Sequence, residues 1–122
     1  MEYPFDKLFL VCNGPRCNNP DRGNERGEPI QKALKAHNKS MGRKPTVRVC
    51  ATSCFDMCDH GPNMVVEPGH TIYSHLTAMK AIEAYAGEMG DEPRRTDLEL
   101  TEEEFNAGSS ASARKKGLRT ED

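Results

Sequence analysis

The sequence predicts an α/β fold in the order β-α-β-β-β-α, with a small mixed sheet and a C-terminal tail. Runs of strand length, apolar or alternating, are separated by longer stretches whose apolar residues recur at helical spacing. The composition changes near residue 88, after which charged and small polar residues dominate. We therefore expect one domain at residues 1–87 and an acidic, partly flexible tail at residues 88–122.

The first strand and the first helix have separate signals. Residues 7–11 are almost wholly apolar, as in a strand that is covered on both faces. A turn-rich loop without regular structure is expected next, because Gly and Pro residues are frequent between residues 14 and 23. A helix should then begin between Asn24 and Pro29 and end near residues 38–42.

Three short strands and a second helix are expected after this. Residues 45–50 alternate apolar and polar side chains, and residues 63–67 and 71–73 flank a Pro-Gly-His connection as in a hairpin. Ser74 is the expected N-cap of the second helix. The core-facing stripe of this helix should contain Leu76, Met79, Ile82 and Tyr85, with His75 also in the helix. In the tail, we expect one or two acidic helical turns at residues 97–105, capped by Thr101.

Composition and charge argue against several classes of partner. No apolar run approaches the roughly 20 residues that span a bilayer, so no association with a membrane is expected. The first residues lack the basic and apolar regions of a signal peptide, so we expect a cytoplasmic protein. The net charge is −2, with a basic excess before residue 86 and an acidic excess after it. No cation cluster of the kind that nucleic acid requires is evident in the sequence.

The five cysteines carry the chemical information in this sequence. In a reducing compartment, clustered cysteines bind metal more often than they form disulfides, and an odd count agrees. Cys12 and Cys17 form a C-x4-C pair after the first strand, and Cys54 and Cys58 form a C-x3-C pair after the second. A helical crossover makes these two strands parallel, so both pairs should reach the same edge of the sheet.

Four thiolates at one edge suit an iron–sulfur cluster or zinc. Structural zinc usually takes C-x2-C pairs, whereas the wider gaps here favour a 2Fe-2S cluster with two cysteines on each iron. We therefore expect Cys12, Cys17, Cys54 and Cys58 to be both the metal ligands and the cofactor-binding residues. Cys50 is expected to be a small buried strand residue; the alternative is that it is the fourth ligand in place of Cys54, or a reserve ligand.

The second cysteine loop also carries a family resemblance. Residues 54–62, Cys-Phe-Asp-Met-Cys-Asp-His-Gly-Pro, followed by Val-Val-Glu-Pro at residues 65–68 and by Tyr73, resemble the second half of the thioredoxin-like 2Fe-2S ferredoxins. The C-x4-C pair and the gap after it are similar to those of the 2Fe-2S subunit of respiratory complex I. The resemblance covers residues 7–85 and departs from the family at residues 55–57, where members commonly have a Gly. It implies a thioredoxin-like fold, one 2Fe-2S cluster per chain near the surface, one-electron transfer and frequent homodimers.

The predicted function is therefore that of a 2Fe-2S ferredoxin, an electron-transport protein and not an enzyme. It would carry one electron between redox partner proteins, such as a reductase and an acceptor enzyme. Four cysteines would be its cluster ligands, and it would have no catalytic residues. The alternative is a structural zinc-binding interaction module. A thiol–disulfide oxidoreductase is disfavoured, because no C-x-x-C follows the first strand.

Overall fold

The computed structural model describes residues 1–2, 4–14, 17–53 and 61–108 of the chain. Its centre is a four-stranded sheet in the order β2-β1-β3-β4. The strands are β1 (Lys7–Cys12), β2 (Val47–Thr52), β3 (Met64–Glu67) and β4 (Thr71–Tyr73). β1 pairs with β2 in parallel and with β3 antiparallel, and β3 pairs with β4 antiparallel. The predicted α/β class and mixed sheet are confirmed.

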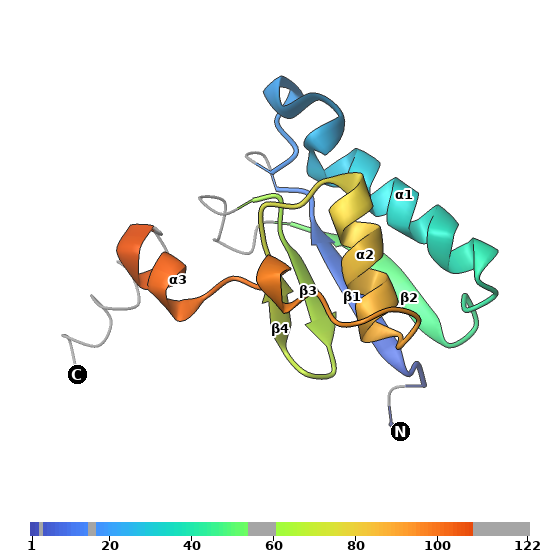
Figure 1. The fold of residues 1–122 in the computed structure, drawn as a ribbon. Helices are drawn as coiled ribbons and strands as arrows, with labels where there is room; N and C mark the ends of the chain where they lie inside the picture. The colour runs from blue at the N-terminus through green and yellow to red at the C-terminus, as the bar shows by residue number, and fades with distance from the viewer. Residues whose placement is uncertain (3, 15–16, 54–60, 109–122) are drawn as a thin grey trace.

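Two helices cover one face of this sheet. Figure 1 shows α1 (Gly27–Ser40) and α2 (Ala78–Glu88) side by side on the same face of the strands. The apolar positions of alternate strand residues and of both helices meet in one core between these layers. The core consists of Phe9, Val11, Ile30, Leu34, Val47, Val49, Met64, Val66, Tyr73, Leu76, Ala81, Ala84, Tyr85 and Leu98.

One polar side chain lies inside the core and links three elements. Asn38 of α1 is 3% exposed. Its Nδ2 donates a hydrogen bond to the carbonyl oxygen of Val47 at 2.9 Å, and its Oδ1 accepts one from the Tyr85 hydroxyl at 2.6 Å. Because a buried polar group without partners is destabilising, these two bonds fix α1 against both β2 and α2.

The segment between β1 and α1 has more regular structure than predicted. Residues Pro20–Glu25 form a 3-10 helix, η1, where the Gly and Pro content predicted an irregular loop. The side chain of Asn19 accepts a hydrogen bond from the backbone N–H of Asp21 at 2.9 Å, and Pro20 follows at the first helical position. An Asn cap followed by Pro is a helix-start signal, which explains why this prediction was wrong.

The second helix begins later than predicted. Its N-cap is Thr77, whose side chain accepts a hydrogen bond from the N–H of Lys80, and not Ser74. Ser74 is buried, and its N–H donates to the carbonyl oxygen of Leu98 at 3.0 Å. His75 therefore lies ahead of the helix, and its φ of 52° is in the left-handed region. The prediction that Met79 faces the core was also wrong: Met79 is 71% exposed, and the buried face of the helix contains Ala81, Ala84 and Tyr85.

The chain after α2 returns along the sheet edge. It forms a short 3-10 helix, η3 (Thr96–Leu98), which contributes the buried side chain of Leu98 to the core. The N–H of Leu100 then donates to the carbonyl oxygen of Ile72 in β4 at 3.0 Å. α3 (Glu102–Gly108) follows, and the side chain of Thr101 caps it by accepting from the N–H of Glu104 at 3.1 Å, as predicted. The domain boundary at residue 87 stays a prediction.

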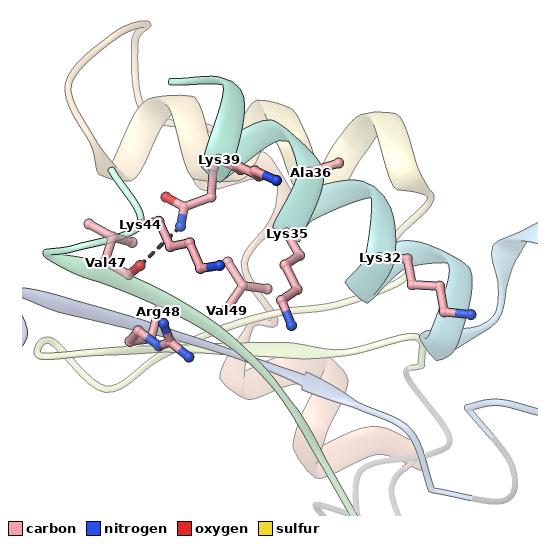
Figure 2. Close-up of a pocket in the computed structure, with 9 residues that line it drawn as sticks. Lys32, Lys35, Ala36, Lys39, Lys44, Val47, Arg48 and Val49 are labelled. Atoms are coloured by element: carbon pink, nitrogen blue, oxygen red, sulfur yellow. Dashed lines mark hydrogen bonds between the residues drawn. The ribbon is translucent and has the colours of Figure 1, made fainter. Parts of the chain in front are cut away.

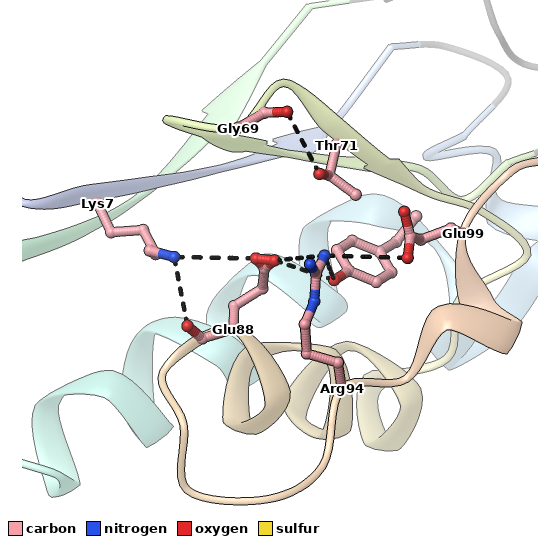
Figure 3. Close-up of polar contacts among 7 residues, drawn as sticks. Lys7, Gly69, Thr71, Glu88, Arg94 and Glu99 are labelled. Atoms are coloured by element: carbon pink, nitrogen blue, oxygen red, sulfur yellow. Dashed lines mark hydrogen bonds and ion pairs between the residues drawn. The ribbon is translucent and has the colours of Figure 1, made fainter.

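The carboxylate of Glu88, at the end of α2, binds residues of the sheet and of the segment that follows α2. The side chain of Glu88 is 8% exposed and accepts hydrogen bonds from the Tyr73 hydroxyl at 3.2 Å and from Arg94 Nη2 at 3.1 Å. Lys7 Nζ lies 3.8 Å from its other carboxylate oxygen. Figure 3 shows Lys7 and Arg94 on either side of this carboxylate. Glu88 thus links β1, β4 and the segment that follows α2.

Candidate metal centre

Two of the four predicted ligands lie together at one end of the sheet. Cys12 is the last residue of β1, and Cys17 follows a short loop. Both residues are fully buried and pack against each other. The structure therefore brings the first predicted ligand pair together, with both thiols shielded from solvent.

The loop that carries these cysteines is held by backbone hydrogen bonds. The N–H of Asn13 donates to the carbonyl oxygen of Thr52 at 2.8 Å, which continues the β1–β2 ladder past Cys12. The N–H of Asn18 donates to the carbonyl oxygen of Gly14 at 2.9 Å, and the Asn18 side chain accepts from the N–H of Glu28 at 2.9 Å. The loop is thus anchored to β2 on one side and to the start of α1 on the other.

The first residue of α1 completes this arrangement. The N–H of Gly27 donates to the carbonyl oxygen of Cys17 at 2.8 Å. A Cβ atom at position 27 would lie 2.1 Å from the carbonyl oxygen of Cys12 and 2.6 Å from the side-chain oxygen of Asn13. Only glycine fits such a close approach of two backbones. Sequence reasoning missed Gly27, although a glycine within the predicted helix start was a signal for it.

The other predicted ligands, Cys54 and Cys58, lie outside the described residues, in the segment 54–60. Described residues on both sides of that segment contact Cys12. The Cys12 thiol lies 3.7 Å from the carbonyl oxygen of Ser53, and the N–H of Cys12 donates to the carbonyl oxygen of Asn63 at 3.0 Å. Ser53 and Asn63, which precede and follow the segment, therefore both lie beside the first cysteine. The four-cysteine ligand set stays a prediction.

The donors at this end of the sheet fit a thiophilic metal group. Two buried thiols are soft ligands, which suit iron–sulfur clusters and zinc. The side-chain oxygen of Asn13 is also buried there and accepts no hydrogen bond from the described residues. Within the described ranges, no group of three or more His, Cys, Asp or Glu side chains could hold a metal ion.

Cys50 lies in β2, as predicted, but it is not buried. Val47 and Val49 face the helices and are buried, so Cys50 faces the opposite side of the sheet and is partly exposed. Its partner in the β1 register is Leu10. The prediction of a buried residue was wrong because side chains alternate along a strand, and only one face of this sheet is covered by α1 and α2.

In the described part of the chain, no helix is both long and apolar enough to cross a membrane.

Comparisons with known proteins found a similarity in three-dimensional structure but no match to the sequence. No protein-family model matches the sequence, and no curated protein matches it. The structure is similar to the thioredoxin-like [2Fe-2S] ferredoxin of Aquifex aeolicus, with a TM-score of 0.66 and 19% identity over 82% of this chain and 100% of that one. Two cysteine-to-serine variants of the same ferredoxin match with a TM-score of 0.65 and with 17% and 20% identity, over 79% of this chain and 99% of theirs. The predicted thioredoxin-like fold is confirmed.

Proposed function

We propose that the protein is a 2Fe-2S ferredoxin, a soluble cytoplasmic carrier of single electrons between redox partner proteins. The observation that carries the proposal is the burial of Cys12 and Cys17 together at the end of β1. Ser53 and Asn63, which precede and follow the segment that holds Cys54 and Cys58, both contact Cys12 there. The fold around this pair is that of the structures described as thioredoxin-like [2Fe-2S] ferredoxins.

In this proposal, the four cysteines hold one cluster per chain. The bound cluster supplies a one-electron redox couple, and the protein supplies its ligands and surroundings. Burial of Cys12 and Cys17 keeps water away from their sulfur atoms, and Gly27 lets the start of α1 approach them closely. No catalytic residues are assigned, because electron transfer requires neither a bound substrate nor a general acid or base.

Colour and spectroscopy test this proposal. We expect the full-length protein, purified without oxygen, to be red-brown, with visible absorption that dithionite bleaches. Electron paramagnetic resonance of the reduced protein should show a binuclear cluster. Cys12→Ser and Cys17→Ser should each lower the iron and sulfide content. A colourless protein that contains one zinc ion per chain would instead establish the zinc-binding module.

We also propose that two copies form a homodimer through the open face of the sheet. Four partly exposed residues form a row across this face, because Leu10 is paired with Cys50 and Val65, and Val65 with Ile72. Both α1 and α2 pack on the other face (Figure 1). A second copy would remove this apolar row from water. Analytical ultracentrifugation of the protein and of its Val65→Lys variant tests the proposed dimer. The parent protein should sediment as a dimer and the variant as a monomer. A parent protein that is monomeric at micromolar concentration would contradict the proposed dimer.

A further inference from the structure

A basic groove lies between α1 and the edge strand β2, on the helix-covered side of the sheet. Its volume is about 310 Å³. Figure 2 shows lysines of α1 and the first residues of β2 lining the same space. Its lysines are Lys32, Lys35 and Lys39 from α1 and Lys44 from the turn after α1. Arg48 of β2 also borders the groove, but its side chain points to the opposite face of the sheet, because side chains alternate along the strand. Ala36 and Val49 are among its apolar lining residues, and none of the carboxylates in the described part of the chain lines it.

Among the residues that the structure describes, most of these cations have no carboxylate partner. Lys32 pairs with Glu28 at 2.8 Å, one helical turn away. In the described part of the chain, Lys35, Lys39, Lys44 and Arg48 form no ion pair, although the guanidinium of Arg48 lies 5.6 Å from the ring centre of Phe5. The chain as a whole has a net charge of −2. Positive charge is therefore concentrated at this groove, and such a patch attracts negatively charged partners.

The strand beside the groove also has an open edge. β2 is the outermost strand of the sheet. The N–H of Val47 donates to the carbonyl oxygen of Arg43 at 2.8 Å, and its own carbonyl oxygen accepts from Asn38 Nδ2 at 2.9 Å, so both groups point away from β1. Backbone direction alternates along a strand, so the N–H and carbonyl groups of Val49 and Ala51 point to the same outer side. An edge of this kind can pair with an added strand.

We propose that the groove and the outer edge of β2 bind an extended acidic segment of the redox partner. The segment adds as a strand beside Val49 and Ala51, and its carboxylates pair with Lys35 and Lys39. The inference rests on the proposed function, because it takes the partner to be a redox protein. β2 ends at Thr52, directly before the segment with Cys54, so the added strand would lead the partner toward the candidate metal centre.

The uniform sign of the charges is what selects an acidic segment. Single lysines beside an edge strand serve to prevent unwanted pairing with other sheets. Here, several cations of the same sign surround one groove, so they repel basic segments and attract acidic ones. Apolar side chains of the bound segment would lie against Ala36 and the aliphatic parts of the lysines, which line the same groove.

Synthetic peptides test the proposal with the full-length protein. The probe is a fluorescent decapeptide of alternating Glu and Val, and its charge-reversed form has Lys in place of Glu. Anisotropy should show that the acidic peptide binds at low ionic strength and that the Lys form does not. Lys35→Glu should weaken binding about tenfold, which corresponds to about 1.4 kcal/mol. Lys80→Glu is the matched control, because Lys80 is an exposed helix lysine outside the groove and should leave binding unchanged.

A second measurement tests the strand pairing itself. Binding of the acidic peptide should slow the hydrogen exchange of the Val49 and Ala51 amides, and an acidic peptide with N-methylated backbone should not do so. Equal effects of Lys35→Glu and Lys80→Glu, or unchanged exchange at both amides, would overturn the proposal. The visible spectrum of each sample is recorded as well. Loss of peptide binding in a cluster-containing protein refutes only this inference, whereas a colourless protein refutes the proposed function.

Discussion

Gly27, the first residue of α1, lies so close to Cys12 that a side chain between them is impossible. A Cβ atom at position 27 would lie 2.1 Å from the Cys12 carbonyl oxygen, which belongs to the backbone and cannot swing aside. The same glycine donates its N–H to Cys17 at 2.8 Å. The start of α1, Cys12 and Cys17 therefore form one packed unit.

Gly27→Ala is expected to disturb this unit. The methyl group must push α1 away from the end of β1, and overpacking of this kind typically destabilises a protein by about 1–3 kcal/mol. Because Cys12 and Cys17 move with these elements, the iron content per chain should fall as well. Urea unfolding and iron analysis measure the two effects.

The control for this substitution is Gly42→Ala. Gly42 has a φ of +71°, so an alanine is strained there, but no atom lies within 4 Å of the added Cβ. It should lower the stability by about 1 kcal/mol and leave the iron content unchanged. Equal iron content in the Gly27→Ala and Gly42→Ala proteins would show that the close approach at Gly27 does not support the cysteines.

Glu88→Ala should be among the more destabilising substitutions outside the core. It removes the acceptor of the Tyr73 hydroxyl and of Arg94, and it leaves Lys7 without its carboxylate. Since Arg94 is about half exposed, we expect a loss of about 2 kcal/mol rather than the larger cost of breaking a fully buried pair. Urea unfolding monitored by circular dichroism gives the value. Glu92→Ala, at an exposed carboxylate nearby, should change stability by less than about 0.5 kcal/mol; similar losses in both variants would contradict the role of Glu88.

Local sequence patterns predicted much of this fold. The apolar run at residues 7–11 and the hairpin at residues 63–73 had clear periodicity and turn residues, and both are present. The start of the second helix was harder to predict, because Ser74 and Thr77 are both good N-caps and only tertiary packing selects between them. Ser74 is instead bonded to Leu98, far along the chain, which no local pattern indicates.

Local sequence patterns also predicted part of the candidate site. The position of Cys12 followed from the end of an apolar strand, and its burial with Cys17 agrees with a shared site. The basic groove was not predicted, because Lys35 and Val49 belong to different elements and line one groove only when α1 packs on β2. Spacing in sequence reveals a site within one loop more readily than a surface shared by two elements.

Cys50→Ser is expected to leave the cluster intact. Cys50 is paired with Leu10 inside the sheet and faces the side opposite the helices, whereas Cys12 is fully buried at the end of β1. Iron content and the visible spectrum should match those of the parent protein. Cys54→Ser should lose the cluster, since a residue held in β2 is poorly placed to replace a ligand in the following loop. A cluster that survives in Cys54→Ser but disappears in the double variant would establish Cys50 as a reserve ligand.

The Arg43–Asp91 pair should give stability a defined dependence on pH. Arg43 Nη1 and Nη2 donate to the two carboxylate oxygens of Asp91 at 2.7 and 2.6 Å, and these bonds hold the pKa of Asp91 below its usual value. A carboxyl group whose pKa is lowered by folding stabilises the folded protein above its unfolded pKa of about 3.9. This contribution is lost only as the pH falls through the lower pKa of the folded state.

Asp91→Asn should therefore lower the urea midpoint by the same amount at about pH 7 and about pH 5, because both values lie above the unfolded pKa. The difference between variant and parent should shrink only under more acidic conditions. Asp97→Asn is an informative comparison: its carboxylate accepts from Arg95 at 3.0 and 2.9 Å, but the two residues are close in sequence, so their pair joins no distant elements. It should change the midpoint less than Asp91→Asn, which releases the turn after α1 from the turn after α2. A difference between Asp91→Asn and the parent that has already vanished at about pH 5 would mean that Arg43 does not hold this carboxylate in solution.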